Sequence, residues 1–316
     1  MKKLFALLMA LVLACSFLTA VCETAAPLRI VCTTFPQYDW TRQLLGDRAD
    51  DVELTLLLDN GIDLHNYQPT ADDIIKIARS DLFIYVGGES DAWVDDLLET
   101  SQNSHVKALS MLACVDAKEE EAVEGMQEEA DEHDSDEIEY DEHVWLSLRN
   151  AKTITRAIAD ALCEADPAHA ETYRANANAY IAQLAELDAQ YADMVRHAAR
   201  TAILFADRFP FRYLADDYGL TYYAAFAGCS AETEASFKTI AFLAKKVDEL
   251  NLPAVLAIEG GNHAIAETVV ASTQAKNQVI LSMNSLQSMT EADVQRGESY
   301  LSVMTQNLAI LTQALN

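Results

Sequence analysis

The chain has 316 residues and a formal net charge of -28, with 50 Asp and Glu residues against 22 Lys and Arg. This balance excludes nucleic acid and anionic lipid as direct ligands, because binding either one requires basic patches on the protein. Cations are the natural partners of so negative a chain.

The N-terminus, residues 1–26, has the layout of a secretory signal peptide. Lys2 and Lys3 precede an apolar run, residues 4–14, that is shorter than the about 20 residues a membrane-spanning helix needs. Residues 12–15 (Val-Leu-Ala-Cys) resemble a bacterial lipoprotein cleavage site, which would acylate Cys15; ordinary signal cleavage is the alternative. We expect an extracytoplasmic protein, periplasmic or at the cell surface, that touches the membrane only through such a lipid anchor.

From residue 28 onward, short apolar runs alternate with amphipathic stretches. Residues 28–33 and 81–86 are predicted to be buried strands, and residues 37–45 and 71–78 are predicted to be helices. Alternation of this kind predicts a parallel sheet covered by helices on both faces. We expect this first α/β lobe to extend over residues 28–166.

His65 is predicted to lie on a loop at the end of a strand. It follows an apolar run, residues 52–58, and a turn, and Pro69 disfavours helix before it. Open α/β sheets bind ligands at the carboxyl ends of their strands, and imidazole is the commonest protein ligand of transition metals. His65 is therefore a candidate metal ligand, with a histidine of no special role as the alternative.

An acidic loop, residues 117–142, precedes the second candidate ligand, His143. Between Glu119 and Glu142 there are 14 Asp or Glu residues and no Lys or Arg. A block of this kind is typical of a solvated loop, which could collect cations only weakly. After His143, Asn150 is expected to cap a helix that begins at Ala151.

Residues 167–199 are predicted to form one long helix that links two lobes. Pro167 suits a first helical turn, Asp166 is a candidate cap, and no Gly or Pro occurs from residue 168 to 199. Apolar residues recur there at three- and four-residue spacing, and the helix would be about 45 Å long. That length is enough to run along both lobes.

The second lobe, residues 200–316, repeats the alternation. Strands are expected over residues 201–206, 254–259 and 279–281, and helices over residues 237–250, 265–273 and 295–315. The predicted fold is therefore α/β, with two lobes joined by one long linker helix. Each lobe would be a mostly parallel sheet covered by helices.

The cysteines of the folded part are Cys32, Cys114, Cys163 and Cys229. No C-x-x-C pair occurs, so a thiolate zinc site is not expected, and we interpret these cysteines as structural or free. A disulfide remains open if the compartment is oxidising. Residues 229–234 are interpreted as a loop and a helix cap, with metal binding as the less favoured alternative.

Seven short motifs occur in a characteristic order that covers nearly all of the chain after residue 28. They are residues 33–40 (TTFPQYDW), 63–70 (DLHNYQPT), 71–74 (ADDI), 81–88 (DLFIYVGG), 142–146 (EHVWL), 218–220 (YGL) and 300–307 (YLSVMTQN). Together they resemble the zinc/manganese family of ABC-transporter substrate-binding proteins. The resemblance implies that His65 and His143 are metal ligands, and that a rigid helical linker lets the lobes shift little when metal binds.

The resemblance leaves the ligands of the second lobe open. The family's third ligand corresponds to Arg208, which has no lone pair to offer. We expect its neighbour Asp207 to neutralise the arginine and turn towards the metal, with a simple salt bridge between the two as the alternative. The family's fourth ligand corresponds to Asn284, and Glu259, at a predicted strand end, is a further candidate; His263 is interpreted as a surface residue.

The leading hypothesis is a monomeric receptor that captures a divalent metal ion between its lobes and delivers it to an ABC permease in the membrane. Two imidazoles favour Zn²⁺, and Mn²⁺ is the next candidate. The alternatives are a secreted zinc-dependent hydrolase and a metal-binding surface adhesin. No H-E-x-x-H, G-x-S-x-G or P-loop motif is present, so we expect no enzyme.

Overall fold

The computed structural model describes residues 27–100, 106–127, 139–230 and 234–316. The predicted signal peptide with Cys15, and residues 128–138 of the predicted acidic loop, lie outside the described residues. Among the helices of the described ranges, none is both long enough and apolar enough to cross a membrane.

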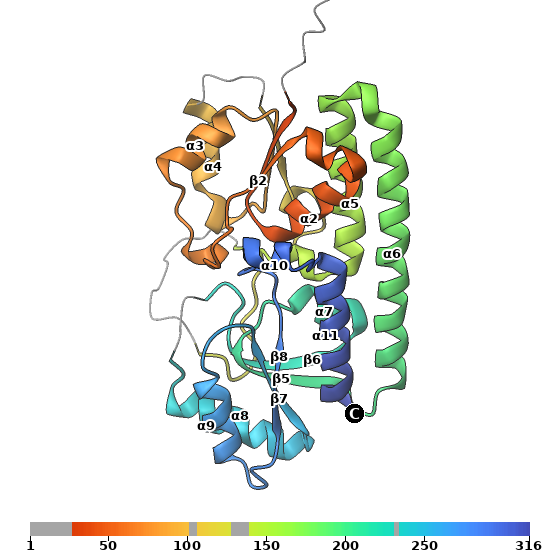
Figure 1. Ribbon diagram of the computed structural model, residues 1–316. Coiled ribbons are helices and arrows are strands. Elements are labelled where there is room, and N and C mark those ends of the chain that lie inside the picture. The colour runs from red at the N-terminus through yellow and green to blue at the C-terminus, as the bar shows by residue number, and fades with distance from the viewer. Residues whose placement is uncertain (1–26, 101–105, 128–138, 231–233) are drawn as a thin grey trace, which may run out of the picture.

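The first lobe is built on a parallel four-stranded sheet with the strand order β2-β1-β3-β4 (Figure 1). Its strands are β1 (Arg29–Cys32), β2 (Glu53–Leu56), β3 (Leu82–Tyr85) and β4 (Lys107–Ser110). Its helices are α2 (Phe35–Leu45), α3 (Ala71–Ala78), α4 (Trp93–Thr100) and α5 (Leu148–Ala165). The central strands β1 and β3 are mostly apolar and buried because helices cover both faces of the sheet.

The second lobe contains another parallel four-stranded sheet, with the order β6-β5-β7-β8. Its strands are β5 (Ala202–Arg208), β6 (Thr221–Phe226), β7 (Ala254–Ile258) and β8 (Val279–Met283). Its helices are α7 (Arg212–Tyr218), α8 (Phe237–Leu250), α9 (Ala264–Ser272), α10 (Glu291–Gln295) and α11 (Tyr300–Leu315). The predicted fold class, two parallel sheets flanked by helices, is confirmed.

Helix α6 (Ala170–His197) runs along the side of both lobes (Figure 1). Its 28 residues give a length of about 42 Å. It packs against α2 and α5 of the first lobe and against α7 and α11 of the second. The hydroxyl of buried Tyr191 donates a hydrogen bond of 2.6 Å to the Met304 carbonyl in α11, which fixes the end of α6 to the second lobe.

Several helix boundaries differ from the prediction, and two of the differences have a clear local cause. Helix α5 begins at Leu148 rather than at Ala151, because the Ser147 hydroxyl accepts the Asn150 N–H at 3.0 Å and so acts as the N-cap. The single helix predicted over residues 295–315 is wrong. The chain turns at Gly297, whose φ of 87° favours glycine, and this turn separates α10 from α11.

Buried polar contacts join the two lobes. The Trp145 indole N–H donates to the Ser285 carbonyl at 2.8 Å, and the Tyr300 hydroxyl donates to the Trp145 carbonyl at 2.6 Å. The Tyr300 N–H in turn donates to the carboxylate of Asp39 in α2 at 2.9 Å. These side chains are buried, so separating the lobes would leave their polar groups without partners, which costs free energy.

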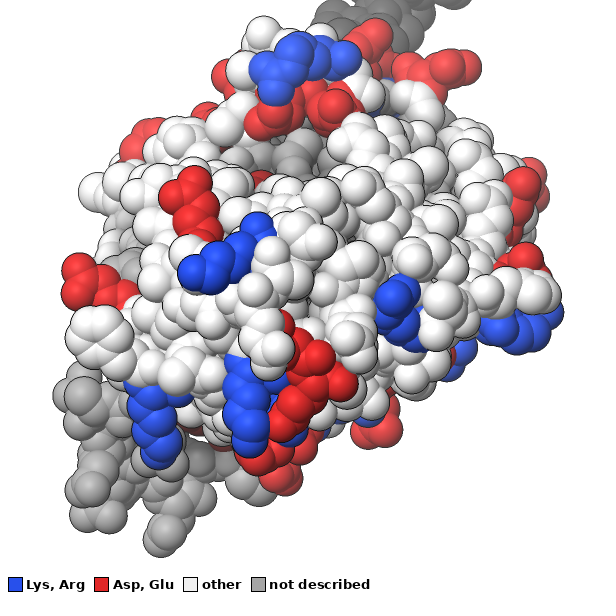
Figure 2. Space-filling model, turned by 90° about the horizontal axis from the view of Figure 1, so that it is seen from below, with Lys and Arg blue, Asp and Glu red and all other residues white. Residues whose placement is uncertain are grey.

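The described part of the predicted acidic loop packs against the second lobe instead of extending into solvent. The Gln127 N–H donates to the Ala225 carbonyl of β6 at 2.9 Å, and its side-chain oxygen accepts the Ser236 N–H at 2.7 Å. Glu121 pairs with Arg212 at 3.1 Å. Seen from below, the molecule shows acidic and basic residues interspersed among larger areas of other residues, so the negative charge is not gathered on this face (Figure 2).

Candidate metal centre

Three side chains with metal-binding atoms converge between the lobes. His65 lies in a 3₁₀ turn (Leu64–Asn66), His143 directly precedes another (Val144–Leu146), and Cys229 follows β6 of the second lobe. The Nε2 atoms of the two histidines are 3.2 Å apart. One donor atom from each of the three residues lies within 4.8 Å of the other two.

Hydrogen bonds orient both imidazoles. The His143 Nδ1 lies 2.9 Å from an Asp141 carboxylate oxygen, and the His65 Nδ1 lies 2.9 Å from the Ser90 hydroxyl and 3.5 Å from Glu142 Oε2. With each Nδ1 donating its hydrogen to these oxygens, each Nε2 presents a lone pair towards the other ring. An oxygen acceptor behind a metal-binding histidine fixes the ring in this way in metal sites generally.

The spacing of the two nitrogens fits a single metal ion. Two nitrogens bound tetrahedrally at zinc-ligand distances are about 3.3 Å apart, and the His65 and His143 Nε2 atoms are 3.2 Å apart. A nitrogen and a thiolate sulfur on the same ion would be about 3.6 Å apart. Closing the present cluster, whose donors lie within 4.8 Å of one another, requires a movement of at most about 1.2 Å.

The segment that carries Cys229 fits tightly against His143. A Cβ added at Gly228 would lie 3.1 Å from the His143 Cε1 and 3.0 Å from the Phe209 carbonyl oxygen, closer than most real Cβ contacts. On the other side, the Cys229 N–H donates to the Glu120 carboxylate at 2.9 Å. A side chain at position 228 would therefore push against His143 or Phe209, and the acidic segment holds the cysteine from the other side.

Burial strongly perturbs the titrating groups of the cluster. Burial lowers the pKa of His65 to about 3 and raises the pKa of the Cys229 thiol well above its usual value. Burial also opposes protonation of His143, but the Asp141 carboxylate beside its ring raises the pKa of His143 overall. Burial raises the pKa of Glu142 to about 7. A bound divalent cation would offset the cost of the thiolate and carboxylate forms.

Asp207 and Glu259 are not among the clustered donors, and all three of the other predicted ligands make hydrogen bonds of their own. The Asp207 carboxylate accepts the N–H groups of Arg208 at 2.9 Å and Ile258 at 3.2 Å. The Glu259 carboxylate accepts the N–H and the hydroxyl of Ser285 at 2.7 and 2.6 Å. The Asn284 side-chain oxygen accepts the Leu286 N–H at 2.7 Å.

Arg208 pairs with a residue that the sequence interpretation did not consider for it. Its Nη2 lies 2.5 Å from Oδ2 of Asp63 in the first lobe, whereas we expected Asp207 to neutralise it. Burial of Asp63 favours its neutral form, but the Arg208 guanidinium keeps the pKa of Asp63 below its ordinary value. Asp63 Oδ1 also accepts the His65 N–H at 3.0 Å. The ion pair thus connects the second lobe to the turn that carries His65.

Cys229 is the member of the cluster for which the sequence interpretation gave metal binding only as the less favoured alternative. All four cysteines in the described part of the chain are free thiols, so Cys229 is not committed to a disulfide. The signal that could have found it is the position of the Gly228-Cys229 pair a few residues after the apolar run Ala224-Ala225-Phe226, which is a strand end in the second lobe.

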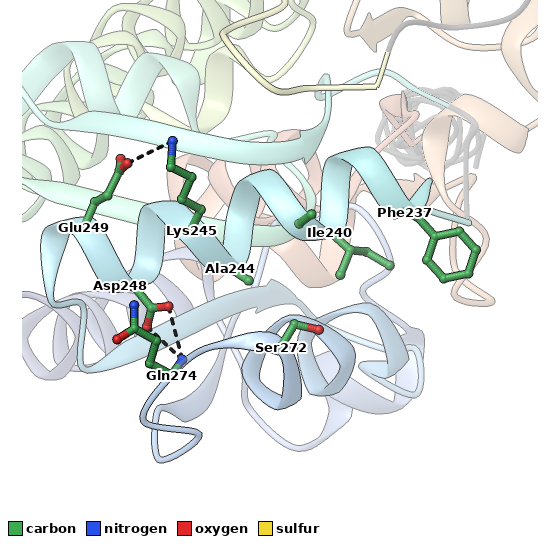
Figure 3. Close-up of a pocket in the computed structure, with 9 residues that line it drawn as sticks. Phe237, Ile240, Ala244, Lys245, Asp248, Glu249, Ser272 and Gln274 are labelled. Atoms are coloured by element: carbon green, nitrogen blue, oxygen red, sulfur yellow. Dashed lines mark hydrogen bonds and ion pairs between the residues drawn. The ribbon is translucent and has the colours of Figure 1, made fainter.

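A separate pocket of about 680 Å³ lies on the second lobe, between α8 and the end of α9 (Figure 3). Phe237, whose exposed fraction is 92%, stands at one end of it. At the other end, Lys245 pairs with Glu249 at 3.2 Å, and the Asp248 carboxylate accepts the Gln274 N–H at 3.1 Å. None of the three clustered donors lines this pocket, so it is distinct from the candidate metal centre.

The chain is similar in sequence to known proteins. Residues 30–314 match the family described as zinc-uptake complex component A, periplasmic. The zinc-binding lipoprotein AdcA of Streptococcus pneumoniae (strain ATCC BAA-255 / R6) is 34% identical over 321 residues, covering 99% of this chain and 61% of AdcA. The high-affinity zinc uptake system protein ZnuA of Bacillus subtilis (strain 168) is 29% identical, covering 96% of this chain and 95% of that protein.

The fold is also that of a solved structure, the Zn(II)-bound ZnuA-like domain of Streptococcus pneumoniae AdcA. The two share 31% identity with a TM-score of 0.73, over 92% of this chain and 99% of that domain. The chain thus corresponds to one domain of AdcA and spans less than two thirds of that relative. The family match extends over nearly the whole chain, and the chain belongs to the family of zinc-uptake complex component A, periplasmic.

Proposed function

We propose that the protein is an extracytoplasmic receptor that captures one Zn²⁺ ion between its lobes and delivers it to an ABC permease. The observation that carries this proposal is the 3.2 Å separation of two Nε2 atoms, one on His65 and one on His143. Without a cation, the two nitrogens suit this distance only as donor and acceptor of one hydrogen bond, with the hydrogen on one Nε2. With a cation between them, both nitrogens become ligands at ordinary zinc geometry.

The relatives support the choice of metal and of role. AdcA is named a zinc-binding lipoprotein and the Bacillus subtilis relative a zinc uptake protein, and we extend both properties to this chain. A lipid on Cys15 would hold the receptor at the membrane, where the permease lies. Mn²⁺ is the less favoured cargo, because it prefers carboxylate oxygens and the cluster is made of nitrogen and sulfur.

Isothermal titration tests the capture step. Chelator-stripped protein is titrated with Zn²⁺ and with Mn²⁺, and so are His65→Gln, His143→Gln and the control His197→Gln, which alters an exposed histidine at the end of α6. The parent and the control should bind Zn²⁺ tightly, and the two cluster variants at least about tenfold more weakly, which is about 1.4 kcal/mol. A parent that binds no more tightly than about 10 μM, or roughly 7 kcal/mol, contradicts the proposal.

Growth tests the delivery step. A deletion strain should grow poorly in zinc-limited medium, and the parent gene should restore growth while His143→Gln should not. Normal growth of the deletion strain, in a host with no second zinc-uptake system, would contradict a role in delivery.

A further inference from the structure

We propose that the Cys229 thiolate is the third protein ligand of the ion, so that the site is a two-histidine, one-thiolate centre that selects Zn²⁺ over Mn²⁺. This inference rests on the proposed function, because it names the remaining ligand and the metal preference of the same site. Two observations and one chemical property support it: the position of Cys229 just after β6, the contacts that hold its segment, and the metal preference of thiolate sulfur.

The position of Cys229 is next to the position that Arg208 occupies. Arg208 is the last residue of β5, and it lies in register with Phe226, the last residue of the neighbouring parallel strand β6. Both strands therefore end at the same edge of the sheet, which is where open α/β sheets bind their ligands. A donor three residues beyond β6 reaches the same space as a donor at the end of β5.

Arg208 cannot bind the metal, but it holds the segment that does. Its Nη2 pairs with Asp63 at 2.5 Å, and its Nη1 donates to the Ser230 carbonyl at 3.4 Å, one residue after Cys229. The guanidinium charge is thereby paired with the Asp63 carboxylate and not with a donor of the cluster.

The contacts around Cys229 fix its sulfur beside the imidazoles. Its N–H is held by Glu120 at 2.9 Å, and Gly228 lies against the His143 ring. Contacts therefore constrain the chain before, at and after Cys229.

The donor set determines which metals bind. Thiolate sulfur and imidazole nitrogen suit Zn²⁺, whereas Mn²⁺ prefers carboxylate and carbonyl oxygens. Three protein donors also leave one position of a tetrahedral ion for water or another ligand, as in zinc sites that exchange a ligand. An ion that has to be released to a permease benefits from an open position.

Cobalt substitution tests the inference without relying on a variant. Co²⁺ bound to a thiolate shows a sulfur-to-metal charge-transfer absorption in the near ultraviolet, whereas Co²⁺ bound only to nitrogen and oxygen does not. Co²⁺-loaded parent protein should show this absorption. The control Cys114→Ser removes a partly buried free thiol elsewhere and should retain it, and Cys229→Ser should lose it.

Metal titrations provide the second measurement. Cys229→Ser should bind Zn²⁺ at least about tenfold more weakly than the parent, and Cys229→Asp, which supplies a hard oxygen, should shift the Zn²⁺-to-Mn²⁺ affinity ratio towards Mn²⁺. If the parent binds Zn²⁺ tightly through its histidines but its Co²⁺ form lacks the absorption, the thiolate inference is overturned and the proposed function stands. If the parent binds no Zn²⁺, the proposed function itself fails.

Discussion

Arg208 and Asp63 form an ion pair across the two lobes, with Nη2 and Oδ2 2.5 Å apart, beside the candidate metal centre. The exposed fractions of the two side chains are 16% and 15%, so each would be poorly solvated without the other. Because Asp63 also accepts the His65 N–H, the pair couples the lobes to the position of one proposed ligand. The charge of Arg208 is therefore paired across the lobes.

Replacing one partner of this pair should damage both stability and binding. Asp63→Asn can still accept the His65 N–H, but it leaves a partly buried guanidinium unpaired, so we expect unfolding in urea to be easier by about 2–4 kcal/mol and Zn²⁺ binding to weaken. The double variant Asp63→Asn with Arg208→Met should recover part of both losses, because it removes the unpaired charge. Additive effects in this double-mutant cycle would show that the pair contributes no coupling.

Glu120 should act on zinc affinity through the position of Cys229. Glu120→Ala removes the acceptor of the Cys229 N–H, and we expect about tenfold weaker Zn²⁺ binding in calorimetry, a loss typical of groups that support metal ligands. Glu120→Gln keeps a side-chain oxygen as acceptor and should bind like the parent. Equal losses in the two variants would show that the charge of Glu120 matters and the hydrogen bond does not.

Gly228 should affect Zn²⁺ binding because it packs against the His143 ring. In Gly228→Ala the added methyl would lie about 3 Å from the His143 ring, so the ring or the Cys229 segment has to move, and we expect Zn²⁺ affinity to fall at least about tenfold. Gly219→Ala is the matched control: its methyl meets nothing within 4 Å, but its φ of 68° strains alanine by about 1 kcal/mol. Gly219→Ala should lose stability and keep its Zn²⁺ affinity. If Gly228→Ala kept its Zn²⁺ affinity, the packing argument would be contradicted.

Asp91 should make stability depend on pH. Its Oδ2 accepts the N–H groups of Val86 and Gly87, its Oδ1 is buried with no hydrogen-bond partner among the described residues, and burial raises the pKa of Asp91 to about 6. In the unfolded chain the pKa is about 3.9, so the folded state favours the protonated acid. Its stabilising contribution is full below about pH 4 and is lost as the pH rises through about 6.

The stability of the neutral variant Asp91→Asn relative to the parent should therefore increase as the pH rises. The difference in unfolding free energy between Asp91→Asn and the parent should shift in favour of the variant by about 2–3 kcal/mol between pH 4 and pH 7. Urea denaturation at a series of pH values measures it. A difference that does not change with pH would show that Asp91 is ionised as readily in the folded state as in the unfolded chain.

Periodicity and caps predict most of the fold. Helices α3 and α8 have the predicted bounds, and in the structure Thr70 and Ser236 cap their N-termini. The prediction fails where a local signal competes with another one. Ser147 caps α5 ahead of Asn150, and the turn at Gly297 separates α10 from α11 where one helix was predicted. The family match also confirms the family that the ordered motifs indicate.

The site is less predictable than the fold. His65 and His143 stand in motifs with local signatures, but Cys229 joins them only because β6 ends beside β5 and the Glu120 segment crosses between the lobes. Strand order and lobe packing arise from contacts between distant residues, which local sequence patterns do not encode. The partner of Arg208 was missed for the same reason, since Asp63 lies 145 residues away in the chain.

The most direct test of the account is one anomalous-scattering experiment on crystals of the protein grown with Zn²⁺, with data collected on both sides of the zinc edge. We predict one strong peak between the lobes, about 2.0–2.1 Å from the Nε2 atoms of His65 and His143 and about 2.3 Å from the Cys229 sulfur. A peak bound by other residues, or no ordered zinc between the lobes, would contradict it.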